Sequence, residues 1–384
     1  MILLLNACST ISYNMNKETT LAMATHELKE DDLLNVSIQI FEPGKLPKDK
    51  EDRLGLSVEI RKSEARYMPI HLKYTLQRTG FWGNVRVLPA DNEGSEVVIK
   101  GKIINSDGEN IELNIQAYDA TNKKWFDKDY EETIDINSQQ QMNTEIEIKD
   151  RFQNLYNEIS NDLIEYRQEI TASEVKKIKQ IAEMRFASSM APSTFSTYIQ
   201  QNKNNINQLI KLPADHDSMM NRVHSIQSRD DMLVDTINNY YDIYYSDMWE
   251  SYDNWRKFRS EELDAIREIE NKAITQKILG VAAIIGAIAL GASNNSRVVD
   301  STDALRAVMI AGGSYSVYEG FKTSKESEIN KEAMQELGTS FAVEVEPYVV
   351  DVNGKTMELT GSADQQYDKW RRLLKTIYTT ETSF

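Results

Sequence analysis

The densest group of side chains that could carry out acid–base chemistry lies in YYDIYYSDMWESYDNWRKF, residues 240–258. Its carboxylates, interleaved with aromatic residues, are Asp242, Asp247, Glu250 and Asp253. Hydrolysis of a glycosidic bond needs two carboxyl groups held a fixed distance apart, whereas carboxylates on the outer face of a helix need only water around them. The residues therefore favour a protein that is not an enzyme. A protein that binds or cleaves cell-wall glycan is therefore the least favoured of three predicted functions, and the other two follow from features described below.

Metal and cofactor chemistry find no support in the other reactive residue types. The histidines are scattered along the chain: His26, His71, His216 and His224. Since the chain has a single cysteine, it has no C-x-x-C pair, and it contains no H-E-x-x-H motif or EF-hand spacing. We therefore expect neither a metal site nor a cofactor.

Aromatic residues of the same stretch recur at spacings of three or four, which places them in one stripe along a helix. The simpler interpretation is that the stripe packs against a partner helix, with tyrosine hydroxyls reaching its polar rim. The alternative is a surface that binds a protein partner or a glycan, because Tyr and Trp are favoured anchors of interfaces. The residues of this predicted binding surface are Tyr241, Tyr245, Trp249, Tyr252 and Trp255.

The only cysteine, Cys8, ends the stretch MILLLNAC. Its four last residues, Leu-Asn-Ala-Cys, resemble the lipobox of bacterial lipoproteins, L-x-[A/G]-C. The resemblance implies cleavage before Cys8 and its acylation, so residues 1–8 are interpreted as a truncated lipoprotein signal. The stretch lacks the basic region and the 7–15 apolar residues of a full secretory signal. The alternative is an idle or buried thiol in a cytosolic protein.

Residues 9–30 are polar and weakly patterned, as expected of a tether. Ser9 follows the cysteine at the position where, in lipoproteins, an Asp tends to retain the protein at the inner membrane. The resemblance therefore implies a lipid anchor in the outer membrane, with the protein on its periplasmic face.

The charge balance argues against nucleic acid as a partner. The chain carries 44 basic and 60 acidic residues, a net charge of −16, whereas nucleic-acid binding depends on neutralising phosphates with Lys and Arg. The densest basic run is KKIK (176–179), which we interpret as a solvated helix face.

Residues 31–135 have the pattern of a compact α+β domain. Strands are predicted from apolar alternation in 33–44, in 82–89 and in three runs of 95–134 that are separated by turn residues such as Asp107-Gly108. A helix is predicted over 56–79, ending at Gly80 as its C-cap, and Pro69 indicates a kink or the first turn of a second helix.

This domain resembles the periplasmic α/β module of several outer-membrane lipoproteins, including the curli-secretion lipoprotein and the N-terminal domain of the Tol-complex propeller protein. The residues that carry the resemblance are the strand 36–41, the helix end LQRTG (76–80), WGNVRVLP (82–89) and the hairpin IKGKI…DG…LNIQAYDAT. The resemblance implies a protein-binding or assembly module without catalytic residues.

Helix formers dominate residues 145–340, which are predicted to form a helical domain. Apolar spacing from Ile164 to Met184 predicts one helix that runs to the break at Ala191-Pro192, and a very long helix is predicted from about Ser228 to Gly291. Such a helix needs neighbours to bury one face, so we expect a helical bundle or an elongated hairpin.

The apolar run ILGVAAIIGAIALGA (278–292) opens a predicted glycine-rich helical hairpin, residues 278–320. Small residues that allow close helix packing are Ala282, Gly286, Ala287, Gly291 and, in the second helix, Gly312. The hairpin is similar to the glycine-zipper segments of some envelope lipoproteins. Because a membrane span needs about 20 apolar residues, the alternatives are a buried hairpin tip, a hairpin that inserts into the membrane or forms oligomers, and a conventional transmembrane anchor.

Residues 341–384 predict two strands around Asn353-Gly354 and a final helix capped by Ser362, which we expect to add strands to the first sheet. The predicted fold class is α+β: an N-terminal α/β sandwich-like domain, a long helical hairpin or bundle, and a short C-terminal β-hairpin plus helix. The predicted function is a non-enzymatic envelope lipoprotein that acts as an assembly or scaffold factor through an envelope protein partner or self-association. The alternative is a ring-forming outer-membrane export component that uses the glycine-rich hairpin.

Overall fold

The computed structural model describes residues 18–48, 56–134, 150–290, 332–336, 338–339, 342, 345–352 and 355–382, and gives only the backbone for 262, 265–266, 268–290, 351–352, 355 and 381–382. The chain divides into two compact units. The first comprises Met1–Trp249 and Gln335–Phe384, and the second comprises Glu250–Met334. These boundaries fall inside the predicted helical domain, because residues 150–249 belong to the same unit as the N-terminal sheet.

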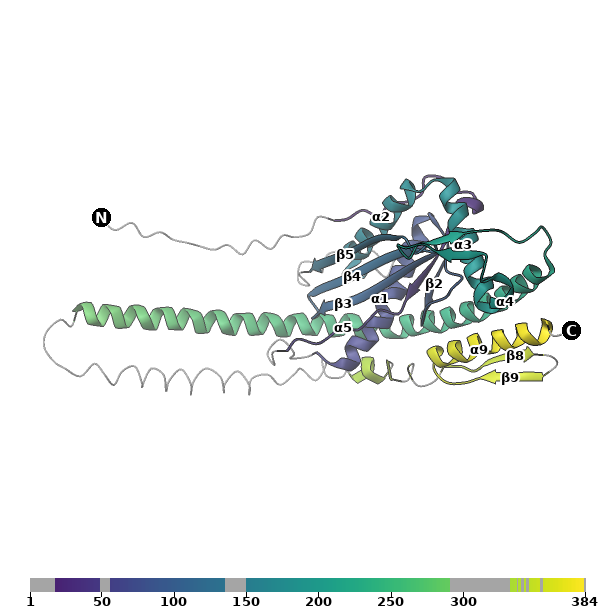
Figure 1. Cartoon of the computed structure of the whole chain (residues 1–384). Coiled ribbons are helices and arrows are strands. Elements are labelled where there is room, and N and C mark those ends of the chain that lie inside the picture. The colour runs from purple at the N-terminus through teal and green to yellow at the C-terminus, as the bar shows by residue number, and fades with distance from the viewer. Residues whose placement is uncertain are drawn as a thin grey trace. The chain divides into compact units, whose positions relative to one another are not determined.

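The first unit is built on a five-stranded mixed sheet with the strand order β2-β1-β3-β4-β5 (Figure 1). The strands are β1 (Leu34–Gln39), β2 (Trp82–Leu88), β3 (Val97–Ser106), β4 (Asn110–Asp119) and β5 (Lys124–Thr133). β1 lies between β2 and β3 and is parallel to both, and β3, β4 and β5 form the antiparallel meander. The predicted α+β class and all five predicted strands are confirmed.

Helix α1 (Val58–Thr79) packs against this sheet and buries Met68, Leu72 and Leu76 completely. It begins at the N-cap Ser57, whose hydroxyl accepts a hydrogen bond from the amide of Ile60. It ends at Gly80, which has a left-handed φ of 73°, so the predicted C-cap is confirmed. Pro69 lies inside α1 and does not divide it.

The predicted single helix around 164–184 is wrong, since two helices occupy this region: α2 (Gln153–Glu169) and α3 (Ala172–Met190). Ile170 is extended, and Thr171 with Glu174 forms a capping box that starts α3. After the short helix α4 (Pro192–Phe195), the polar, Asn- and Gln-rich segment 198–208 leads into a small antiparallel hairpin. Its strands are β6 (Ile199–Gln201) and β7 (Asn207–Leu209), and no strand was predicted there.

Helix α5 (Ser218–Leu290) spans 73 residues and begins ten residues before its predicted start. Within the first unit it covers the edge strand β2. The Asn238 side chain accepts a hydrogen bond from the amide of Val87 at 2.8 Å and donates one to the Val87 carbonyl at 3.1 Å. Arg86 pairs with Asp231 and Asp235 of α5. The two hydrogen bonds of Asn238 occupy backbone groups of β2 that an open sheet edge would offer to another chain.

The C-terminal segment forms β8 (Tyr348–Val352), β9 (Lys355–Leu359) and α9 (Ala363–Thr382). The predicted N-cap is confirmed, because the Ser362 hydroxyl accepts a hydrogen bond from the Gln365 amide at 3.3 Å. The strands pair only with each other in a separate two-stranded sheet, so the expectation that they extend the first sheet is wrong.

Candidate functional site

The first half of the predicted aromatic stripe is packed inside the chain. Tyr241 is fully buried, and Tyr245 is only 8 % exposed. The Tyr245 ring stacks on Tyr67 of α1 with 4.6 Å between the ring centroids, and its hydroxyl lies 2.7 Å from Nδ1 of His71. These contacts favour the packing interpretation over the binding interpretation for this half of the stripe.

The remaining members of the stripe also pack within the chain, since Tyr252 and Trp255 are each 1 % exposed. Trp249 is half-buried, and its ring lies 6.5 Å from that of Tyr67. In the second unit, Tyr252 and Trp255 stack on each other at 5.9 Å, and the Arg256 guanidinium lies 4.0 Å above the Tyr252 ring. The part of these residues in partner binding stays a prediction.

Asp242, the first carboxylate of the stripe, is bound by two residues of α1. Asp242 accepts a hydrogen bond from the Tyr74 hydroxyl at 2.8 Å and forms an ion pair with the buried Lys73. Burial, together with this carboxylate, raises the pKa of Tyr74. Asp247 and Glu250 are exposed. The geometry of Asp242 therefore suits a charge that joins α1 to α5 rather than an acid or a base.

His71 is the buried member of the four histidines and connects three helices of the first unit. Its Nε2 lies 3.0 Å from the side-chain oxygen of Gln153 in α2, and its Nδ1 faces Tyr245 of α5. The Tyr156 ring meets its imidazole edge to face at 4.5 Å. Because both ring nitrogens have protein partners, we interpret His71 as part of the core.

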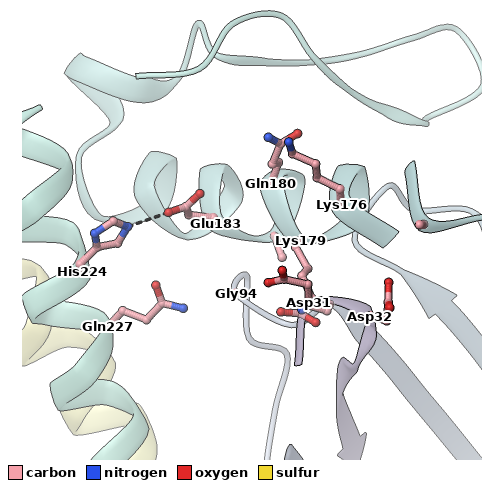
Figure 2. Close-up of a pocket in the computed structure, with 12 residues that line it drawn as sticks. Asp31, Asp32, Gly94, Lys176, Lys179, Gln180, Glu183, His224 and Gln227 are labelled. Carbon is pink, nitrogen blue, oxygen red and sulfur yellow. Dashed lines mark hydrogen bonds and ion pairs between the residues drawn. The ribbon is translucent and has the colours of Figure 1, made fainter. Parts of the chain in front are cut away.

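A polar cavity of about 700 Å³ lies beside α3 and α5 in the first unit (Figure 2). Its lining comes from four places: the turn η1 (Glu30–Asp32), the loop before β3, helix α3 and helix α5. The charged and amide side chains there are Asp31, Asp32, Glu96, Lys176, Lys179, Gln180, Glu183, His224 and Gln227. None of the predicted binding residues lines this cavity.

Within the cavity, most of the charges already have partners in the chain. His224 Nε2 lies 2.6 Å from Glu183 Oε1, as the dashed line in Figure 2 marks. Lys179 donates to the Glu30 carbonyl at 3.0 Å. Glu96 accepts hydrogen bonds from the backbone and side chain of Asn35, while burial raises its pKa. The mixture of signs and the exposure of the His224–Glu183 pair select no single ligand charge and form no nucleophile–base pair.

Metal-ligand geometry is also missing from the part of the chain that the structure describes. No group of three or more His, Cys, Asp or Glu side chains is placed there to hold a metal ion. The two lysines that line the cavity belong to the run 176–179, which was interpreted as a solvated face.

An asparagine ladder on α2 is the most specific polar arrangement that the sequence patterns did not identify. The ladder consists of Asn154, Asn157 and Asn161. Their side-chain amides bind the backbone of an extended segment, residues 18–24, which we call the strap; it runs beside α2 in Figure 1. Part of the predicted tether is therefore fastened to the fold. The spacing of three and four residues was the available signal, but no apolar pattern accompanies it.

Glu132 at the end of β5 supports the start of the ladder. It is 3 % exposed, and its carboxylate accepts hydrogen bonds from the Leu155 amide at 2.8 Å and from Asn154 Nδ2 at 3.0 Å. Burial raises the pKa of Glu132 to about 7, although these two hydrogen bonds oppose the rise. With its Nδ2 directed at Glu132, Asn154 presents its oxygen to the strap.

The remaining predicted site residues lie mainly outside the described side chains. Cys8, Gly291 and Gly312 are outside the described residues, and Ala282, Gly286 and Ala287 lie in the backbone-only part of α5. Among the helices that the structure describes, none combines the length and the apolarity needed to cross a membrane.

Comparison with protein-family models, with curated proteins and with solved structures finds no match for this chain. The lipobox-like residues and the likeness to periplasmic lipoprotein modules therefore stay predictions. The function has to be argued from the chain itself.

Proposed function

We propose that the protein is a non-enzymatic lipoprotein of the cell envelope, anchored through Cys8 in the outer membrane on its periplasmic face. It works as a scaffold or assembly factor through protein–protein contacts. The contacts are made with an envelope protein or with another copy of the chain, and they involve the part of α5 that lies in the second unit.

The observation that carries this proposal is the composition of α5 along its length. Its first part is bound within the first unit by Asn238, Tyr245 and the acids that pair with Arg86. The same helix continues through the second unit to Leu290 and ends in the uncharged run 278–290. A helix of this length is stabilised chiefly by packing of one face, and an uncharged, small-residue face is suited to close helix packing.

The lipid anchor predicts that Cys8 is the acylated residue. In its native host, the protein should incorporate an alkyne analogue of palmitate and fractionate with the outer membrane. Cys8→Ser should lose both the label and the membrane fraction, whereas Ser9→Ala should keep the label. Mass spectrometry of the labelled N-terminal peptide checks the site. An unlabelled wild-type protein in the soluble fraction would refute the anchor and support the idle-thiol alternative.

The protein–protein contact predicts cross-linking from the uncharged end of α5. A photo-cross-linking amino acid at Ile285 should capture one defined envelope protein or a second copy, identified by mass spectrometry. The same group at Asn239, an exposed position of α5 in the first unit, should capture neither. Gly286→Leu should abolish the cross-link from position 285, because a large side chain prevents close approach of helix backbones.

The same experiment separates the second candidate, the ring-forming export component. The small residues Ala282 and Gly286 lie four apart in one continuous helix, which favours packing of identical helices. A ring gives a regular series of cross-linked copies and a large mass in mild detergent, and Gly286→Leu disperses it. A scaffold gives one cross-linked partner and no such series. Absence of any cross-link from position 285 in cells contradicts both.

A further inference from the structure

The hydrogen bonds between the strap and the ladder are made by the strap's backbone. Thr19 donates its amide hydrogen to Asn154 at 3.1 Å and accepts from Asn157 Nδ2 at 2.7 Å. Asn161 accepts from the Ala22 amide at 2.8 Å and donates to the Thr20 carbonyl at 2.9 Å. No side chain of residues 18–24 is buried. The ladder therefore recognises the backbone of the strap rather than its side chains.

Two of the three ladder amides are oriented by hydrogen bonds that do not involve the strap. Asn157 Oδ1 accepts a hydrogen bond from Gln153 Nε2 at 2.9 Å, so its NH₂ group is directed at the strap. Asn154 is oriented by Glu132 in the same way. A binding group whose rotamer is fixed by a second hydrogen bond loses less entropy when its ligand arrives. A further backbone hydrogen bond, from the Ala24 amide to the Thr79 carbonyl at 2.8 Å, holds the end of the strap at α1.

We propose that the asparagine ladder shortens the lipid tether and thereby limits how far the folded protein stands from the membrane. This inference rests on the proposed function, because it uses Cys8 as the anchor. Between Cys8 and Thr19 the chain advances 11 residues (19 − 8), whereas between Cys8 and Ala24, the next residue held by a backbone hydrogen bond, it advances 16 (24 − 8). At about 3.5 Å per extended residue, these lengths span at most about 40 Å and about 55 Å.

The ladder therefore shortens the reach of the anchor by about 15 Å. It also determines where the tether leaves the domain, which is the N-terminal end of α2 and not the C-terminal end of α1, where Ala24 is bound. For a scaffold this distance decides which partners in the periplasm are within reach.

The test uses the purified full chain, since its single cysteine can be coupled chemically. Cys8 is attached to a maleimide lipid in phosphatidylcholine vesicles that contain an acceptor-labelled lipid, and a fluorescent amino acid at the exposed position Glu165 of α2 serves as donor. Energy transfer should be high in the wild-type protein and should fall in the triple variant Asn154→Ala/Asn157→Ala/Asn161→Ala. In Asn161→Ala it should stay near the wild-type value, because Asn154 and Asn157 still hold Thr19. Asn239→Ala, at an exposed site on α5, should leave it unchanged.

Hydrogen exchange of the unattached protein gives a second readout that involves no lipid. The amides of Thr19 and Ala22 should be protected in the wild-type protein, and the Ala22 protection should fall roughly tenfold in Asn161→Ala, the loss expected for hydrogen bonds of ordinary net strength. The partners found for Asn161 are strap atoms, so this variant should unfold at the same urea concentration as the wild-type protein.

Two results would overturn the inference. Unprotected strap amides in the wild-type protein would show that the strap is not bound. Unchanged energy transfer in the triple variant, once its Thr19 amide has lost protection, would show that the strap does not set the distance. Because the coupling to vesicles is chemical, a failure to find acylated Cys8 in cells would refute the proposed anchor without affecting either measurement.

Discussion

Replacing Asp230 with alanine should destabilise the first unit by about 3–5 kcal/mol and release α9 from α5, because it breaks a buried charge pair from one side. Asp230 is 3 % exposed. Its carboxylate accepts hydrogen bonds from Trp370 Nε1 at 3.1 Å, from Arg371 at 3.1 Å and from Asn92 Nδ2 at 3.3 Å. Burial raises the pKa of Asp230, and Arg371 opposes that rise. Without the carboxylate, the indole N–H loses its acceptor and the guanidinium keeps only its ion pair with Glu93.

Urea unfolding followed by tryptophan fluorescence measures this effect, since Trp370 lies at the broken contact. Asp231→Ala is the matched control: this neighbouring carboxylate is about half exposed and pairs with Arg86, so its loss should cost about 1 kcal/mol or less. Asp230→Asn should fall between the two, because it keeps an acceptor for the indole and loses the charge that faces Arg371. Equal losses of unfolding free energy for Asp230→Ala and Asp231→Ala would show that the hydrogen bonds of Asp230 do not hold α9 to α5.

Replacing Tyr245 with alanine should cost about 3–5 kcal/mol, the usual range for removing a large buried aromatic side chain. The variant loses the stack on Tyr67 at 4.6 Å, the edge-to-face contact with Tyr74 at 5.2 Å and the hydrogen bond to His71 at 2.7 Å. Tyr245→Phe keeps the ring contacts and removes only the hydroxyl partner of His71, so about 1–2 kcal/mol is expected.

The comparison with Ile243→Ala decides between the two interpretations of the aromatic stripe. Ile243 is 60 % exposed on the same helix, and its replacement should change the free energy of unfolding by less than about 0.5 kcal/mol. Equilibrium unfolding in urea is the measurement for all three variants. If Tyr245→Ala unfolds like Ile243→Ala and instead loses cross-linking to a partner, this half of the stripe is a binding surface and not part of the core.

The sequence is most informative where local patterns and tertiary packing agree. Alternation of apolar residues and the turn at Asp107-Gly108 predict the five strands, because one face of the sheet is buried and the other is polar. Gly80 marks the end of α1 because only a left-handed residue fits there. The long helix is predictable from its spacing, although its start is not.

The errors occur where polar contacts override apolar periodicity. The apolar spacing continues from Ile164 across Ile170 to Ile178, yet the Thr171 capping box divides the helix. The hairpin of β6 and β7 is stabilised by Asn207, which donates a hydrogen bond to the Ala120 carbonyl at 2.9 Å. The sequence around Asn207 has no pattern that indicates this contact. Asn238 and the asparagine ladder were missed for the same reason: an amide that binds a distant backbone leaves no periodic trace in the sequence.

The position of β1 in the sheet has a consequence for mechanical load. Force applied through the anchor proposed at Cys8 would first meet the strap, whose hydrogen bonds to the ladder lie one after another along the chain and would break singly. Behind the strap, the chain is held by the Ala24–Thr79 hydrogen bond and by the contact of η1 with Lys179. Only then comes β1, which is bonded to β2 on one side and to β3 on the other, so many hydrogen bonds must shear together. The N-terminal segment would thus yield at low force before the sheet bears any load.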